Sequence, residues 1–107
     1  DADNMFIIKE FLSCISEAVS SLTDYQRCLL RLRYKHHMSA TDIVGFCKRT
    51  GCSLIPNKAS SQLKEQDIFY ELNKALKAVL VQIRARYEEQ DSLSMGHLKY
   101  IFEEIGV

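Results

Sequence analysis

The chain has 107 residues, and its 14 Lys and Arg side chains balance 14 Asp and Glu side chains to a formal net charge of zero. It is 47% hydrophobic and 26% charged, with one Pro and four Gly. That composition excludes intrinsic disorder, collagen-like sequence and low complexity, and the length fits one domain. We therefore expect a single domain over residues 1–107. The absence of an initiator Met fits a domain excised from a larger protein or a processed product.

Cysteine usage and the lack of long apolar runs bear on where the protein works. No stretch approaches the roughly 18–20 apolar residues of a membrane span, and the acidic N-terminus differs from a basic secretory signal. Cys14, Cys28, Cys47 and Cys52 are too sparse for a disulfide-stapled mini-domain, so we expect free thiols. The spacing from His37 to the last two cysteines matches no standard zinc pattern. The sequence predicts an intracellular protein, cytoplasmic or nuclear, with no membrane segment, no bound metal and no cofactor.

The first half of the chain predicts three helices. Apolar residues from Phe6 to Leu22 recur with the i, i+3, i+4, i+7 spacing of one buried helical face. Thr23 begins a capping-box pattern that starts a second helix after about two residues, so we expect the first two helices to form an antiparallel hairpin. Ser39 opens a short third helix that Gly51 ends. The second helix should bury one face, made of Tyr25, Cys28, Leu29, Leu32 and His36.

A loop and the longest helix follow. Residues 52–61 contain Pro56, which disfavours a helical conformation at the preceding residue, and should form an internal loop. The next helix should run from about residue 62 to 89, or about 40 Å, which is longer than a globule of this size needs. Its apolar stripe either fills the core or pairs with a partner helix, including one from a second copy. That stripe consists of Phe69, Leu72, Leu76, Val79, Ile83 and Tyr87.

The C-terminal segment predicts one more helix, which Ser94 caps and Gly106 ends. Its inward-facing residues should be Leu98, Ile101, Phe102 and Ile105. No segment of four or more residues alternates convincingly between apolar and polar, so strands are not expected. The predicted fold class is all-α: a small bundle of about five helices, with two helical hairpins around one long helix.

Two parts of the chain resemble each other. In residues 33–51 and again in residues 86–106, an Arg-Tyr pair precedes a Ser-capped helix that ends at a Gly. This arrangement resembles a pair of degenerate EF-hands. A calcium loop needs oxygen ligands at alternate positions and a terminal bidentate Glu, whereas Asp42 and His97 occupy the terminal slots here. The resemblance implies an EF-hand-like pair that does not bind calcium.

The zero net charge conceals an uneven distribution. Residues 25–64 carry eight basic side chains against Asp42 alone, a net charge of +7, and the rest of the chain is acidic. Three of the bases, Arg27, Arg31 and Lys35, recur every fourth residue and so share one face of the second helix. A block of this kind fits an acidic protein surface or a nucleic acid. The expected partner-binding residues are Arg27, Arg31, Lys35, Lys48, Arg49 and Lys58.

The same region contains a second pattern. It reads Leu22-x3-Gln26-Arg27-x-Leu29-Leu30-x-Leu32-Arg33-Tyr34, followed by Ser39-x2-Asp42-Ile43. This pattern, about a fifth of the chain, resembles the start of sigma-factor region 4 and related helix-turn-helix regulators. The resemblance implies DNA contacts by Lys48, Arg49 and Lys58. It would place a recognition helix within a few residues of Gly51, where this sequence has the Pro56 loop.

Motifs of catalysis are missing from the sequence. It has no nucleophile elbow, no Gly-rich phosphate loop and no His-Glu-x-x-His pair, so we do not expect an enzyme. The function predicted first is a non-catalytic helical module that binds a protein partner within a larger protein or complex. The alternative is a nucleic-acid-binding regulatory module that uses the basic block 25–64. Homo-oligomerisation through the long helix is a further hypothesis.

Overall fold

The computed structural model describes residues 2–87 and 93–106, and every regular element within them is helical. A π-helical turn, η1 (Arg31–Lys35), continues the second α-helix, and a short 3-10 helix, η2 (Ser60–Gln62), precedes the fourth. The α-helices are α1 (Ala2–Ser20), α2 (Asp24–Leu30), α3 (Ala40–Thr50), α4 (Glu65–Arg86) and α5 (Met95–Ile105). The predicted all-α bundle of about five helices is confirmed. Within the described ranges, no helix is both long and apolar enough to span a bilayer.

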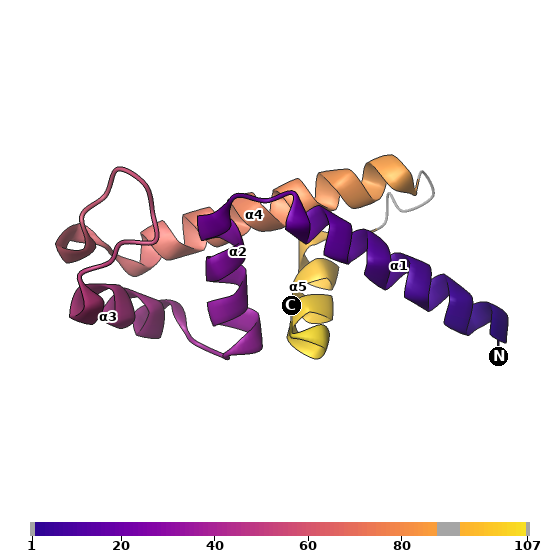
Figure 1. Cartoon of the computed structure of the whole chain (residues 1–107), viewed down its shortest axis with the longest axis horizontal. Coiled ribbons are helices and arrows are strands. Elements are labelled where there is room, and N and C mark those ends of the chain that lie inside the picture. Colours follow the sequence, from indigo (N-terminus) through magenta and orange to yellow (C-terminus); the bar gives the residue numbers. More distant parts are fainter. Residues whose placement is uncertain (1, 88–92, 107) are drawn as a thin grey trace.

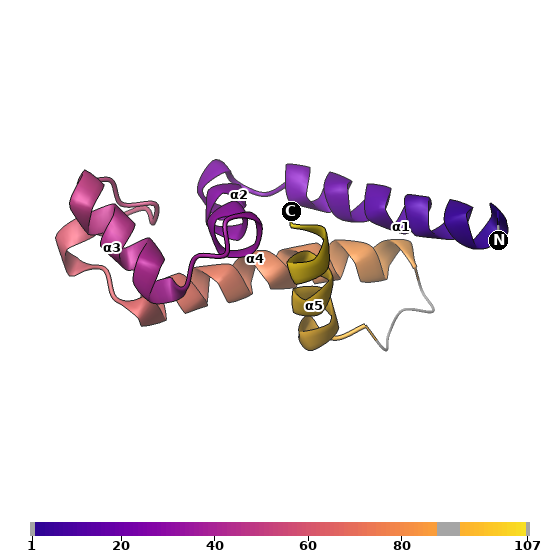
Figure 2. The same ribbon diagram turned by 90° about the horizontal axis from the view of Figure 1, so that it is seen from below.

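The other four α-helices pack on α4, which forms the spine of the molecule (Figures 1 and 2). Its 22 residues rise about 33 Å. Its buried face consists of Ile68, Glu71, Leu72, Ala75, Leu76, Val79, Leu80 and Ile83. One hydrophobic cluster joins this face to side chains from every other α-helix. The radius of gyration is 15.2 Å, above the roughly 13 Å of a globular chain of this length, because α4 and the start of α1 extend lengthwise.

The turn between α1 and α2 differs in detail from the expected hairpin. α1 lies alongside α4, whereas α2 runs across it, so both helices pack on α4 rather than lengthwise on each other (Figures 1 and 2). The Arg27 guanidinium donates hydrogen bonds to the carbonyl oxygens of Ser20, at 2.9 Å, and Leu22, at 3.0 Å. It also pairs with Asp24. These bonds fix the corner. Of the predicted capping box at Thr23, the Thr23 amide donates to Gln26 Oε1 at 3.2 Å, whereas the Thr23 side chain makes no cap hydrogen bond.

The π-helical turn η1 changes which side chains of the second helix face the core. The amide of His36 donates to the carbonyl of Arg31 at 3.0 Å, an i to i+5 bond that widens the turn. Tyr34 is consequently buried, and its ring centroid lies 5.6 Å from that of Phe102. The expectation that His36 lies on the apolar face is wrong, because the side chain is exposed past the wide turn. A regular 3.6-residue period could not have predicted this register.

Helices α3 and α5 begin and end as predicted. Ser39 and Ser94 accept hydrogen bonds from the amides three residues on, and Gly51 and Gly106 end the helices at φ 68° and 67°. His97 completes the second capping box, because its Nδ1 accepts from the amide of Ser94 at 3.3 Å. The inward face of α5 differs at one end. Leu98 and Phe102 are buried and Ile101 is half-buried, whereas Ile105, expected to face inward, is exposed.

Residues 52–59 contain no regular helix or strand, and η2 follows them. Two contacts attach this loop to the bundle. Ile55 is buried, and the Lys58 ammonium donates to the carboxylate of Asp67 at 2.8 Å. α4 begins at Glu65 rather than near residue 62, because η2 occupies residues 60–62. The expected end near residue 89 lies outside the described residues.

Candidate interaction surface

The apolar stripe of α1 is covered over only half of its length. Toward the C-terminal end of the helix, Cys14, Ile15, Ala18 and Val19 are at most 8% exposed. The N-terminal half projects past the end of α4 (Figures 1 and 2). Its exposed apolar residues, between 39% and 63% exposed, are Met5, Phe6, Ile7, Ile8 and Leu12. Ile7, Ile8 and Leu12 continue the stripe that the core covers farther along α1, whereas Phe6 lies on the opposite side of the helix.

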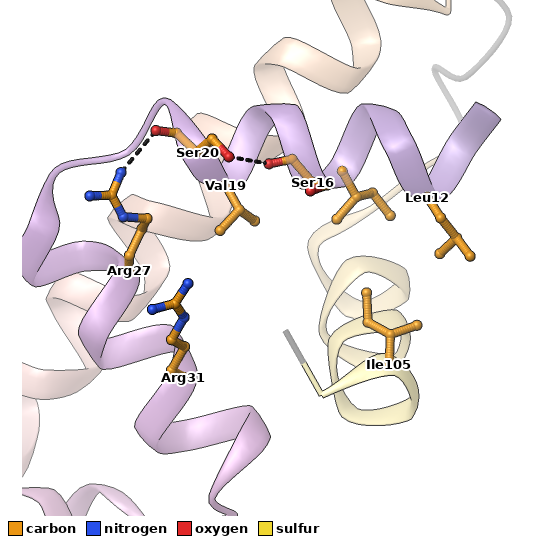
Figure 3. Close-up of a pocket in the computed structure, with 8 residues that line it drawn as sticks. Leu12, Ser16, Val19, Ser20, Arg27, Arg31 and Ile105 are labelled. Carbon is orange, nitrogen blue, oxygen red and sulfur yellow. Dashed lines mark hydrogen bonds between the residues drawn. The ribbon is translucent and has the colours of Figure 1, made fainter. Parts of the chain in front are cut away.

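A first hollow of about 370 Å³ lies where α1, α2 and α5 meet. Its apolar lining comes from Leu12, Ile15, Val19 and Ile105. Its polar lining comes from Ser16, Ser20, Arg27 and Arg31. In Figure 3, Arg31 on the α2 side and Leu12, Val19 and Ile105 surround the open space. An apolar base with cations along one edge suits a ligand that is both apolar and acidic.

A second hollow of about 350 Å³ continues along α1 toward its N-terminus. Ile7, Ile8, Phe11 and Leu12 line it from α1, together with Glu10 and with Tyr87 from the end of α4. The rings of Phe11 and Tyr87 lie 6.2 Å apart in a tilted arrangement. Leu12 lines both hollows, which therefore adjoin, but they open on different sides of α1: the first toward α2 and α5, the second toward Tyr87.

The structure does not bring the six predicted partner-binding cations together. Arg27 is engaged at the α1–α2 corner and Lys58 pairs with Asp67, whereas the other four are exposed. Arg31 lines the first hollow, and Lys35 lies one turn farther along the same helix. The remaining two, Lys48 and Arg49, lie in the last turn of α3, at the end of the molecule opposite the start of α1 (Figure 1). The sequence therefore identified Arg27 and Arg31, which line one side of the first hollow, but it did not identify the apolar residues of α1 as part of a binding surface.

The predicted helix–helix stripe of α4 mostly serves the chain's own core. Phe69 is 55% exposed, and Tyr87 is half-buried against Phe11. The other four residues, Leu72, Leu76, Val79 and Ile83, are at most 4% exposed. In this conformation they contact other helices of the same chain, so homo-oligomerisation through them stays an untested prediction.

Thiol or metal chemistry in this protein would depend on its Cys, His, Asp and Glu side chains. All four cysteines are free thiols: Cys14 and Cys47 are buried, Cys28 is half-buried and Cys52 is exposed. Burial raises the pKa of the Cys14 and Cys28 thiols. Among the described residues, no three His, Cys, Asp or Glu side chains are grouped so that they could hold a metal ion.

One buried carboxylate stands apart from the α1 surface. Glu71 on α4 is 8% exposed, and its Oε2 accepts no hydrogen bond. The Lys74 ammonium lies 4.0 Å from that oxygen, too far for a hydrogen bond. This group is a cost to stability rather than part of the hollows along α1.

Comparison of the chain with protein-family models, with curated proteins and with solved structures finds no match. The structure itself bears on the helix-turn-helix resemblance. The next α-helix after α3 is α4, which begins fourteen residues after Gly51 and buries one face in the core. A helix directly after Gly51, as that resemblance implies, is therefore not formed.

Proposed function

We propose that this chain is a non-catalytic helical module that binds a protein partner within a larger protein or complex. The observation that carries the proposal is the uncovered part of the apolar stripe of α1, where Ile7, Ile8 and Leu12 are 61%, 51% and 39% exposed and line the two hollows. Single exposed apolar side chains are ordinary on protein surfaces, whereas a contiguous group with adjoining hollows is typical of a binding surface.

The energetics indicate what a partner must add. Burying the remaining surface of a half-exposed Ile, Phe or Leu stabilises a complex by about 1 kcal/mol, half of the usual value for complete burial. The three exposed side chains that line the hollows, Ile7, Ile8 and Leu12, together supply about 3 kcal/mol, and association itself costs several kcal/mol. The apolar face alone gives weak binding, so a specific partner would also use the polar edge of the first hollow.

Site-specific photo-crosslinking tests this proposal. A benzophenone amino acid is placed at Ile7, which lines the second hollow, or at Tyr100, on α5, in the otherwise unchanged chain. The two sites form a matched pair because both side chains are large and they are 61% and 64% exposed. In a native extract of the source cells, we expect discrete protein adducts from position 7 that position 100 does not give, and that Ile8→Ser reduces. Identical adduct patterns at the two positions would reject a partner-binding role for this face.

The alternative function, a nucleic-acid-binding module, is supported by the exposure of four cations, Arg31, Lys35, Lys48 and Arg49. Their separation into two places and the engagement of Arg27 and Lys58 rank it second. Fluorescence anisotropy with generic duplex and single-stranded nucleic acid, at increasing salt, tests it. Micromolar and steeply salt-dependent binding would support this alternative, and no binding at low salt would reject it.

A further inference from the structure

We propose that the first hollow, by itself, binds a small amphiphile: an unbranched alkyl carboxylate whose head group pairs with Arg31 and whose tail lies between α1 and α5. The inference goes beyond the proposed function, because it concerns a small ligand rather than a protein partner. It uses only the hollow that α1, α2 and α5 surround.

The apolar lining of the first hollow comes from two helices. Ile15 and Val19 on α1 are 2% and 8% exposed, so they contribute the covered part of the lining. Leu12 on α1 and Ile105 on α5 are 39% and 44% exposed, and Figure 3 shows them at the end of the open space away from Arg31. The volume of about 370 Å³ lies within the range of about 300–1,000 Å³ that is usual for ligand pockets.

The cationic end of the hollow has one arginine that is engaged and one that is not. The Arg27 guanidinium bonds to backbone carbonyls at the α1–α2 corner and to Asp24, and Figure 3 shows it turned toward Ser20. The Arg31 guanidinium extends toward Val19 beside the open space (Figure 3). Within the described part of the chain, no hydrogen bond or ion pair engages Arg31. Its planar group can therefore donate two parallel N–H bonds to a carboxylate.

The acidic side chains of the surrounding helices do not line the first hollow. On α1, Glu17 pairs with Arg86 at 2.8 Å. On α5, Glu103 lies 4.0 Å from Arg33, and Glu104 is exposed outside the lining. The described lining thus contains two arginines and no carboxylate. A ligand with an anionic head group is consequently favoured over one with a neutral or cationic head group.

The size of the first hollow fits one alkyl chain better than a protein. From Val19 to Leu12, α1 advances by seven residues, or about 10 Å. An extended chain of about eight C–C bonds, each about 1.5 Å long along a zigzag, covers that distance, and decanoate has a tail of this length. A protein interface usually needs about 20–30 residues a side, whereas this hollow is lined by Leu12, Val19 and six other residues.

Titration of the full chain with decanoate, kept below its micelle concentration, tests the inference by ¹H–¹⁵N NMR. We expect saturable amide shifts centred on residues 12–20, 31 and 105, with a Kd on the order of 0.1 mM for a ligand of this size. Decylammonium has the same tail and the opposite charge, and acetate has the same head group without the tail. Both controls should bind at least tenfold more weakly than decanoate.

Matched variants separate the two ends of the hollow. Arg31→Gln should weaken decanoate binding about tenfold and remove the preference over decylammonium, whereas Arg49→Gln, at an exposed cation on α3, should leave it unchanged. Ile105→Glu should weaken binding at least fivefold, whereas Tyr100→Glu, on the same helix and 64% exposed, should not. Circular dichroism verifies that each variant is folded.

Several outcomes would overturn the inference. They are no saturable shift, equal affinity for decylammonium, equal effects of the two arginine variants, or shifts centred on Ile7 and Tyr87, which line the second hollow. A dimer in sedimentation velocity that Ile105→Glu dissociates would assign the hollow to a second copy instead. Binding that appears only in a chain shortened to Gly106 would assign it to the C-terminal residue. Crosslinks at position 7 do not depend on decanoate, so failure of this inference is distinguishable from failure of the proposed function.

Discussion

Two isoleucines on the same stripe of α1 should lose very different amounts of stability on truncation. Ile15 is 2% exposed in the core, whereas Ile8, two turns earlier, is 51% exposed. Truncation of a buried Ile to Ala costs about 2–5 kcal/mol, because the lost transfer free energy adds to that of the cavity. At Ile8 only about half of the transfer free energy, about 1 kcal/mol, is lost, and the higher helix propensity of Ala offsets part of it.

Thermal and urea unfolding, followed by circular dichroism at 222 nm, measure the difference. For a domain of this size, each kcal/mol shifts Tm by about 4–8 °C. Ile15→Ala should therefore lower Tm by about 8 °C or more, and Ile8→Ala by a few degrees at most. The crosslinking experiment should give the opposite order, because Ile8 is exposed in the second hollow whereas Ile15 is buried. Equal losses of stability would refute the assignment of the N-terminal half of α1 to solvent.

The remaining predictions concern the core, the thiols and acid stability. Glu71→Met should raise the free energy of unfolding by about 1–3 kcal/mol in urea titrations, because a buried carboxylate oxygen without a hydrogen bond is removed; a loss of stability would show that this oxygen is satisfied. Cys52 should react rapidly with a thiol reagent and Cys14 only on unfolding, since burial blocks access and raises the Cys14 pKa; rapid modification of both would contradict the packing of α1. The pKa of Asp67 is held below its ordinary 3.8, chiefly by the hydrogen bond from Lys58 and then by the backbone amide of Lys64. The ionised Asp67 therefore stabilises the fold above pH 3.8, and this stabilisation is lost as the pH falls through the lower pKa of the folded state. Lys58→Met should consequently move the acid-unfolding midpoint to higher pH, and an unchanged midpoint would show that the pair does not contribute.

Local features of the fold were predictable from the sequence because their causes lie within a few residues. Ser39 and Gly51 delimit α3, as Ser94 and Gly106 delimit α5, through hydrogen bonds and backbone conformations set by adjacent residues. The all-α class follows from the apolar period along each helix in the same way.

The π-helical turn could not be predicted by the same reasoning. Tyr34 enters the core and His36 leaves it because the Arg31–His36 hydrogen bond widens the helix. The ring of Tyr34 packs against Phe102, sixty-eight residues away in the chain. That packing is a tertiary contact, and no local pattern in the sequence encodes it.

The same distinction between local sequence pattern and tertiary contact applies to the candidate site. The sequence determined that Ile8 and Ile15 share one apolar face of a helix, and that Arg27, Arg31 and Lys35 share one basic face. Only the tertiary structure decided that Ile15 is covered and Ile8 is not, and that Arg27 is engaged while Arg31 remains exposed. Periodicity specifies the direction in which a side chain points along its own helix. Whether another element reaches that side chain depends on where α4 ends and how α2 crosses it, and those are contacts between residues distant in the sequence.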